Sequence, residues 1–406
     1  MQKRKNNDKS LFFASALFIV LMGIISMMID MTHEGAKSIY GNFLNIVGAT
    51  PKIISLISGL GEFIGYSLIF VTGIIANKSK KYWTMTIIGY MINLLAIPLL
   101  SLTWDNGWQF ACMLILLERL GKAIRKPAKS TLVSFSSKNI GEGKSFAFVE
   151  FLDQIGAFIG PLILTIVLYI KGTSNLLNTY KTCLLILGIP AVVTLIILLI
   201  AKHKYPNPEN LETAEEIQEK SKIEFNKDFV FYLIAIGLCG FSFIDFPLIE
   251  YHIETLNIIK IENLPTLYSL AMLVDAFSAL LFGVLFDKLG IKTLAISTIL
   301  SMLSPLFIFN FSQKIFIYIG VILWGVGMGS QESILKSAVA KLIKKENRAL
   351  GFGIFEGLFG LSWLLGSFVL GILYENSTLW MIIISIGLQF LAVPFYLLSD
   401  YKKQIN

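Results

Sequence analysis

The chain has 406 residues, of which 55% are hydrophobic and only 15% are charged, and it carries a formal net charge of +7. A water-soluble domain holds roughly 25% charged residues, so this composition excludes a soluble globular protein and predicts a polytopic membrane protein. The basic residues are spread over many short segments, and this distribution argues against a nucleic-acid-binding patch.

The apolar residues gather into stretches of about 20, the length at which a helix crosses the hydrocarbon of a bilayer. The sequence has no run of short segments that alternate apolar and polar residues, so the spans are predicted to be helices and not barrel strands. We therefore predict an all-α protein with twelve transmembrane helices. The predicted spans are residues 11–32, 52–76, 83–102, 107–127, 146–170, 182–201, 229–253, 265–286, 293–311, 315–337, 350–374 and 379–398.

The connections between these spans differ strongly in charge. Most of the 34 Lys and Arg residues lie in the N-terminal tail, in every second connection and in the C-terminal tail. Cytoplasmic segments carry the excess of basic residues, so both termini are predicted to be cytoplasmic. The first span has no small-residue cleavage site behind it, and we expect a retained helix in a multi-pass protein of the cell membrane.

A long polar connection at residues 202–228 divides the spans six and six. The predicted organisation is an N-terminal six-helix bundle at 1–201, a cytoplasmic linker at 202–228 and a C-terminal six-helix bundle at 229–406. The two bundles resemble each other, and the matched pairs are Asp30 with Asp245, Glu150 with Glu356 and Gly160 with Gly366. Two parallel repeats of this kind are typical of secondary transporters, which bind their solute between the halves.

Four short motifs add a resemblance to a known family. Their residues are Asn77 in the loop at 73–81, Arg119 and Arg125 in "ERLGKAIRKPAKSTL", Gly160 and Pro161 in "DQIGAFIGPL", and Gly283, Asp287 and Lys288 in the loop at 283–292. In this order on a twelve-span frame they resemble the major facilitator superfamily over essentially the whole chain. Asn77 stands where that family has an acidic residue. The resemblance implies the twelve-helix fold, and the fifth-span Gly-Pro motif implies export.

The stretch "MIDMTHEGAK" at residues 28–37 places Asp30, His33 and Glu34 on one helix face, because they are three and four residues apart. Three ionisable groups of this kind suit a metal site, a catalytic site or a transport site. No second histidine follows His33 at four residues, which disfavours a metal site, and we expect no metal or cofactor. The three groups face a central cavity if the helix continues past residue 32, and its wetted outer end if it does not.

Further acidic residues are predicted to lie deep in the membrane. Asp245 and Glu250 flank Pro247 in the seventh span, where proline removes a backbone hydrogen bond and predicts a break in the helix. Charges persist at this depth when they face protein or water, usually to handle ions or solutes. The candidates for solute or proton binding are Asp30, His33, Glu34, Glu62, Asp245, Glu250 and Asp275. Structural ion pairs are the competing interpretation.

Arg119 lies about six residues from the inner end of the fourth span, at a depth similar to that of Asp153 in the antiparallel fifth span. We predict that Arg119 pairs with Asp153 or Glu150 as a structural or gating latch. The same class of role is assigned to Asn77, Arg125, Gly160, Pro161, Gly283, Asp287, Lys288 and Glu356.

These observations predict a secondary active transporter, and not an enzyme, that exports a small solute by alternating access. The proton gradient is the predicted driving force, because removal from water favours the neutral form of a carboxyl group and allows proton uptake near neutral pH. An uptake symporter or a facilitator on the same fold is the main alternative, and a membrane-embedded metalloenzyme is a further one. The expected partners are a small-molecule solute and the lipid bilayer, with no nucleic acid, and we expect a monomer.

Overall fold

The computed structural model describes residues 2–137, 140–208, 227–343 and 348–399, which form helices and no strand. The linker predicted at 202–228 lies mostly outside the described residues. The first half of the chain contains α1 (Gln2–Lys37), α2 (Tyr40–Ile46), α3 (Pro51–Ser79), α4 (Tyr82–Leu99), α5 (Trp108–Ser137), α6 (Glu142–Lys171), α7 (Leu176–Ile186) and α8 (Gly188–Lys204). The second half contains α9 (Lys227–Ser242), α10 (Phe246–Thr255), α11 (Leu264–Leu289), α12 (Lys292–Ser301), α13 (Ser304–Asn310), α14 (Lys314–Leu342), α15 (Arg348–Asn376) and α16 (Thr378–Leu398). Helices α1–α8 are called the N-half below, and α9–α16 the C-half.

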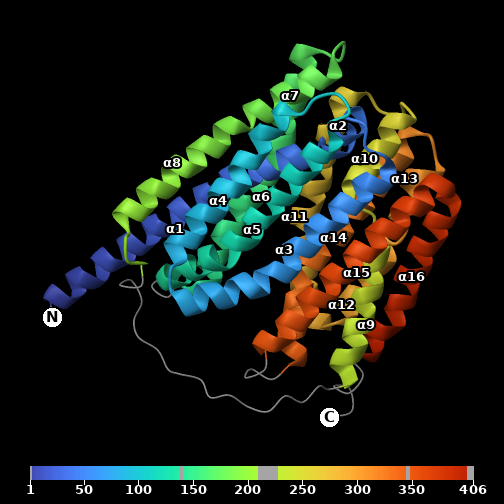
Figure 1. The fold of residues 1–406 in the computed structure, drawn as a ribbon. Coiled ribbons are helices and arrows are strands. Elements are labelled where there is room, and N and C mark those ends of the chain that lie inside the picture. The colour runs from blue at the N-terminus through green and yellow to red at the C-terminus, as the bar shows by residue number, and fades with distance from the viewer. Residues whose placement is uncertain (1, 138–139, 209–226, 344–347, 400–406) are drawn as a thin grey trace.

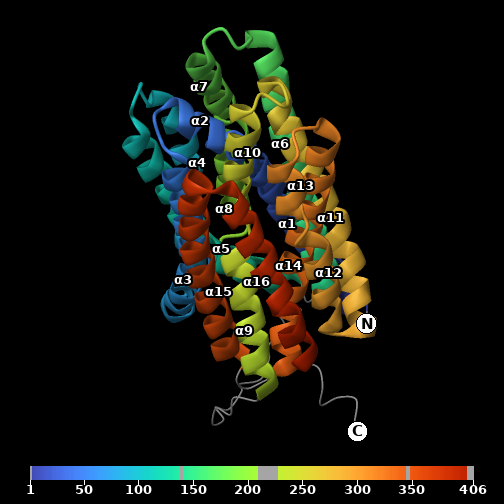
Figure 2. The same ribbon diagram turned by 90° about the vertical axis from the view of Figure 1, so that its right-hand side faces the viewer.

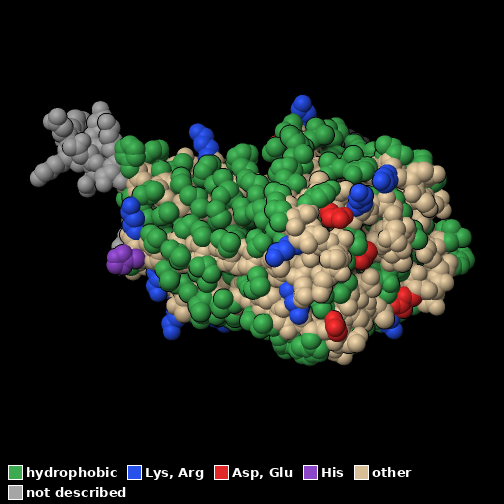
Figure 3. Space-filling view, turned by 90° about the horizontal axis from the view of Figure 1, so that it is seen from above, with side chains coloured by type: hydrophobic (Ala, Val, Ile, Leu, Met, Phe, Trp, Pro, Cys, Tyr) green, Lys and Arg blue, Asp and Glu red, His purple; other side chains and the backbone are tan. Residues whose placement is uncertain are grey.

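The helices account for the twelve predicted spans. In the described part of the chain, 11 segments are long and apolar enough to cross a membrane. The twelfth span is α5, which has the length but carries the charged run around Arg119. Apolar side chains also cover much of the flank in the view of Figure 3, whereas charged side chains gather on part of the end that faces the viewer. This distribution fits a bundle that is surrounded by lipid.

Several spans consist of two helices, and two of the breaks matter for the site. The first span continues past residue 32, because α1 runs to Lys37 and α2 follows after two residues. The seventh span is broken between Ser242 and Phe246, with Pro247 in the first turn of α10. The predicted break is confirmed there, since proline fits the first turn of a helix but not its interior.

The two halves repeat the same close helix contact. A side chain at Gly160 of α6 would collide with the carbonyl oxygen of Met31 on α1, and one at Gly366 of α15 would collide with that of Phe241 on α9. Only glycine permits this approach in both halves. The match supports the internal repeat read from the sequence.

The halves meet along α3 and α15 and along α6 and α11 (Figures 1 and 2). We call the end where α8 ends and α9 begins the linker end, and the end with α2, α7 and α10 the distal end (Figure 1). Hydrogen bonds join the halves at the distal end. They are Gly41 N to Glu250 Oε2 at 3.0 Å, Asn45 to Glu254 at 3.3 Å, Lys52 N to Glu375 at 3.0 Å, Thr165 to Thr266 at 2.8 Å and Tyr169 to Asn263 at 2.6 Å.

Candidate functional site

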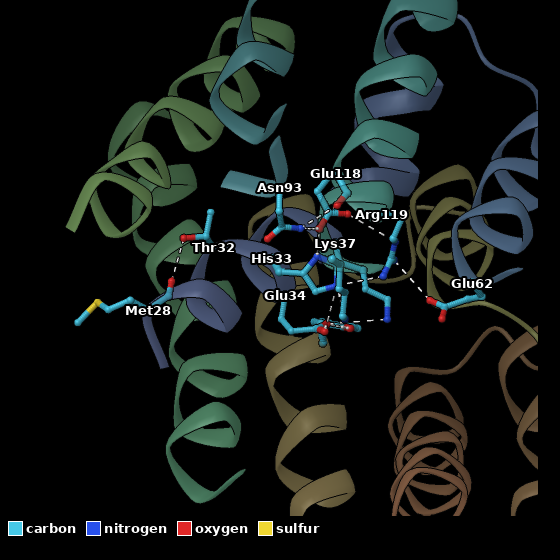
Figure 4. A network of polar contacts seen from close by, with 11 residues as sticks. Met28, Thr32, His33, Glu34, Lys37, Glu62, Asn93, Glu118 and Arg119 are labelled. Atoms are coloured by element: carbon cyan, nitrogen blue, oxygen red, sulfur yellow. Dashed lines mark hydrogen bonds and ion pairs between the residues drawn. The ribbon is translucent and has the colours of Figure 1, made fainter. Parts of the chain in front are cut away.

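A network of charged side chains is buried in the N-half, between α1, α3, α4 and α5 (Figure 4). Its members on α5 are Glu118, Arg119 and Lys122, and the first and last of these share a helix face because they are four residues apart. Helix α1 contributes His33 and Glu34 to the same region. Charges removed from water in this way are stable only when each finds a partner.

His33 is the centre of the network and is 0% exposed. Its Nε2 atom lies 3.0 Å from Nη1 of Arg119 and 3.1 Å from Nζ of Lys122. Its Nδ1 atom lies 2.8 Å from Oε1 of Glu118. Arginine and lysine only donate hydrogen bonds, so Nε2 must offer its lone pair and the ring proton belongs on Nδ1. The contacts therefore assign a neutral imidazole whose Nδ1 atom lies beside the carboxylate of Glu118.

Glu118 is held as firmly as His33. Its side chain is 0% exposed, and the amide of Asn93 on α4 donates to its carboxylate and, at 2.9 Å, to its backbone carbonyl. Oε2 of Glu118 lies 3.5 Å from Nε of Arg119. The carboxylate thus joins a cation, an imidazole and an amide from three helices.

Arg119 makes its second ion pair with Glu62 on α3, with Nη2 and Oε1 3.4 Å apart. The predicted pairing of Arg119 with Asp153 or Glu150 is wrong. Both acids are on α6, where Glu150 is exposed and Asp153 has Lys129 as an electrostatic neighbour. The prediction matched depths along two helices, but the guanidinium extends from the face of α5 that meets α1 and α3.

Glu34 carries the network to the plane between the halves. The hydroxyl of Tyr268 on α11 donates to its Oε2 atom, and Nζ of Lys37 lies 3.9 Å from the same oxygen. The side chains of Glu34 and Glu62 retain 12% and 19% of their exposure. The edge of the network that meets the C-half is therefore partly accessible.

A second charged group lies on the same helices, nearer the linker end. Asp30 has Asp153, Lys122 and Arg125 among its electrostatic neighbours. The ammonium group of Lys129 donates to the hydroxyl of Ser26, and the guanidinium of Arg125 lies 4.8 Å from the ring centre of Tyr90. Asp30 thus belongs to a layer of mixed charge and is not isolated. In the part of the chain that the structure describes, no cluster of three His, Cys, Asp or Glu side chains is placed to hold a metal ion.

In the C-half, Asp245 faces the network across the plane between the halves. It is 8% exposed and accepts hydrogen bonds from Nε1 of Trp363 at 2.8 Å and from Oγ of Ser367 at 2.6 Å. Glu62 and Lys37 of the N-half are among its electrostatic neighbours. The structure therefore brings together four of the predicted residues, which are His33, Glu34, Glu62 and Asp245.

Glu250 makes its contacts at the distal end, whereas Asp275 lies two turns along α11 from Tyr268 and is among its electrostatic neighbours. A passage shared by these acids stays a prediction. Glu250 follows the break in the seventh span and turns towards α2, where it accepts the hydrogen bond from the amide of Gly41. Asp275 is buried where α11 meets α14, and a side chain at Gly329 would collide with its backbone oxygen.

The predicted latch residues of the loops form local contacts. Asn77 accepts a hydrogen bond of 2.9 Å from Nζ of Lys80 in its own loop. Asp287 and Lys288 are exposed, and no ion pair joins either to another described residue. Glu356 is buried on α15. A gating role for these positions stays a prediction, as does the structural or gating role of Pro161, through which α6 continues.

Five residues of the network were not assigned a role from the sequence. They are Lys37, Asn93, Glu118, Lys122 and Tyr268. The sequence did mark Glu118 and Lys122 as candidates, because both are charged and lie next to Arg119 or one turn beyond it. Nothing in the sequence marked Asn93 or Tyr268, because polar and aromatic residues are common in membrane helices. Only the fold brings Asn93 to α5 and Tyr268 to α1.

Two similar halves of membrane-spanning helices, with a charged network at the plane between them, define a polytopic membrane protein of the transporter class. The sequence profile of the Major Facilitator Superfamily matches residues 10–296 and 246–406. The chain belongs to this family, and it is a multi-pass transporter and not an enzyme.

Two relatives resemble the chain over most of its length. The chain is 34% identical to an uncharacterised protein of Mycobacterium tuberculosis over 382 residues, which cover 93% of this chain and 91% of that one. It is 29% identical to an uncharacterised MFS-type transporter of Methanocaldococcus jannaschii over 385 residues, covering 93% and 92% of the two chains.

Solved structures of transporters share the fold. The POT family transporter PepTSo superposes with a TM-score of 0.73 at 12% identity, covering 96% of this chain and 98% of that chain. A variant of the nucleoside transporter NupG gives 0.72 at 12% identity, covering 95% and 99%, and a D-xylose-proton symporter gives 0.67 at 12% identity, covering 95% and 97%. At these identities the likeness shows the fold alone.

Proposed function

We propose that the chain exports a small solute across the cell membrane in exchange for protons, by alternating access of a site between its two halves. The observation that carries this proposal is the buried network around His33, which reaches the C-half through the hydrogen bond from Tyr268 to Glu34. Ionisable groups at membrane depth are costly and are usually kept where ions or solutes are handled.

Two sequence features support the finer parts of the proposal. The excess of Lys and Arg in the tails and in alternate connections supports a cytoplasmic linker end. The sequence at Gly160 and Pro161 resembles the fifth-span motif of exporters. Export therefore corresponds to opening at the linker end, loading of the solute, and release at the distal end.

The contacts suggest how a proton is coupled to this motion. Glu34 accepts a hydrogen bond from Tyr268 of the C-half and also pairs with Lys37 of its own half at 3.9 Å. A proton on Glu34 removes its attraction for Lys37 and weakens the charge-assisted bond from Tyr268. Proton uptake thus loosens one link between the halves, and proton release restores it.

Transport by purified protein in lipid vesicles tests the proposal. A panel of small solutes is added outside the vesicles, whose interior is acidic, neutral or alkaline relative to the medium. Exchange for protons predicts that at least one solute accumulates when the interior is acidic. Accumulation driven by an acidic exterior indicates a symporter, flux without gradient dependence indicates a facilitator, and either result contradicts the proposal.

The same assay tests the role of Asp30 in coupling. We expect Asp30→Asn to abolish gradient-driven accumulation, because an amide cannot take up and release a proton as the carboxyl group beside Lys122 and Arg125 can. Asp105→Asn is the matched control, since Asp105 is exposed in the loop after α4. Wild-type accumulation by the Asp30 variant would remove that residue from the coupling mechanism.

A further inference from the structure

Lys122 differs from the other cations of the network in its partners. Among the described residues, its ammonium group has one hydrogen-bond partner, the neutral Nε2 atom of His33 at 3.1 Å, and no carboxylate oxygen within 4.0 Å. An ammonium group carries three donors and no acceptor. Its nearest acidic influences, Glu34 and Asp30, act beyond contact distance.

Arg119 provides the comparison within the same site. It reaches the same ring nitrogen at 3.0 Å but also pairs with Glu62 at 3.4 Å and Glu118 at 3.5 Å. Two cations therefore converge on one neutral acceptor, and only one of them is neutralised by carboxylates in contact. Like charges at such a short range repel each other, and an anionic group beside Lys122 would offset this repulsion.

Lys122 is also placed where a solute can reach it. Its side chain is half-buried, and Lys126, one turn nearer the linker end on the same helix, is exposed. The two are electrostatic neighbours and form a basic path along α5. Glu150 on α6 is an electrostatic neighbour of Lys126. Basic side chains along a path raise the local concentration of anions.

Asp245, the acidic residue on the C-half side of the site, already has hydrogen-bond partners within the C-half. Asp245 accepts hydrogen bonds from Trp363 and Ser367. The groups that face Lys122 are then Asp30, His33, Glu34 and Lys37 on α1, Glu62 on α3, Glu118, Arg119 and Lys126 on α5, and Tyr268 on α11. In this set Lys37 and Arg119 each have a carboxylate oxygen within 4.0 Å, whereas Lys122 has none and is joined by Lys126 to the linker end.

We infer that the solute carries an anionic group, a carboxylate or a phosphate, that binds the ammonium of Lys122. This inference rests on the proposed transport function but not on its direction or on proton coupling. The anion takes the two donors of Lys122 that His33 leaves unused. Arg119 stays with its two carboxylates and contributes its charge from beside the site.

Ligand-induced stabilisation of the purified full chain tests the inference. Thermal unfolding is measured at constant ionic strength with benzoate against benzamide and benzylamine, with glucose 6-phosphate against glucose, and with a wider panel of acids, each paired with its amide or alcohol. We expect one or more anions to raise the unfolding temperature of the wild type while their neutral partners do not. Stabilisers that are all neutral or cationic, or no stabilising anion, overturn the inference.

Substitutions then assign the anion to Lys122. Lys122→Gln should weaken binding of the stabilising anion by about 10- to 100-fold, the loss expected for a charge-assisted hydrogen bond. Lys122→Arg keeps the charge and should bind within a few-fold of the wild type. Lys171→Gln, an exposed lysine at the distal end of α6, is the control for the charge change. Unchanged affinity in Lys122→Gln overturns the inference.

Vesicle transport separates this inference from the proposed function. An anion that binds through Lys122 but is never moved across the membrane contradicts the transport function and leaves the binding site standing. A neutral solute that Lys122→Gln moves at the wild-type rate contradicts the inference and leaves the transport function standing. Unfolding of Lys122→Gln without ligand, and the result with Lys122→Arg, show whether a loss of binding reflects a loss of fold.

Discussion

The ion pair between Arg119 and Glu62 is open to a double-mutant cycle. The substitutions are Arg119→Gln, Glu62→Gln and the pair together, and the measured quantity is the free energy of unfolding in mixed detergent micelles. Charges 3.4 Å apart attract by about 5 kcal/mol at an effective dielectric constant of about 20. Glu62 is 19% exposed and the guanidinium is shared with Glu118, so desolvation and competition offset much of this attraction.

We therefore expect a coupling energy of about 1 to 3 kcal/mol between Arg119 and Glu62. The matched cycle uses Arg119→Gln with Asp153→Asn, which tests the pairing that depth alone had suggested. Residues without contact couple by less than about 0.5 kcal/mol, and that is the expected value for this second cycle. A stronger coupling to Asp153 than to Glu62 would refute the assignment of the guanidinium to the face of α5 that meets α3.

Three further predictions concern packing and the contacts across the halves. Gly160→Ala should lower the free energy of unfolding by about 1 to 3 kcal/mol, because its methyl group would collide with the carbonyl of Met31. Gly357→Ala should stay within about 0.5 kcal/mol of the wild type, because an added methyl group there would meet no neighbouring atom within 4 Å. Equal effects would argue against the close contact of α1 with α6. Asp245→Asn should cost about 1 to 3 kcal/mol in the same measurement, because an amide offers one acceptor oxygen to two donors, and an unchanged stability would show that these hydrogen bonds do not hold the carboxylate. Tyr268→Phe removes the hydroxyl that joins the halves, so it should change the rate of solute flux by at least several-fold while the affinity of the solute stays near that of the wild type, and unaltered flux would contradict a role in the motion.

Much of the fold followed from the sequence because lipid imposes a simple rule on it. Each span must be long and apolar, so composition alone locates the helices, and α5 was found although its charges exclude it from a strict hydropathy test. The break before Pro247 was also predictable, since proline has no amide hydrogen to donate. These features depend on local chemistry and need no knowledge of neighbours.

The candidate site was predicted only in part, because its contacts depend on which face each helix presents. His33, Glu34 and Glu62 were recognised as costly charges, and the network includes all three. Matching depths in the membrane gave the wrong partner for Arg119, because acidic residues at the same depth can lie on different neighbouring helices. Tyr268 lies 234 residues from Glu34 in sequence, and no local pattern marks such a contact.

Proton movement across a vesicle membrane tests the central claim most directly. The purified chain is placed in vesicles that contain a pH-sensitive dye, at equal pH inside and outside, and a stabilising solute is added to the medium. Exchange predicts that entry of the solute drives protons out, so that the interior becomes alkaline, and that Asp30→Asn prevents this change. An interior that becomes acidic, or whose pH stays constant while the solute enters, would contradict exchange for protons.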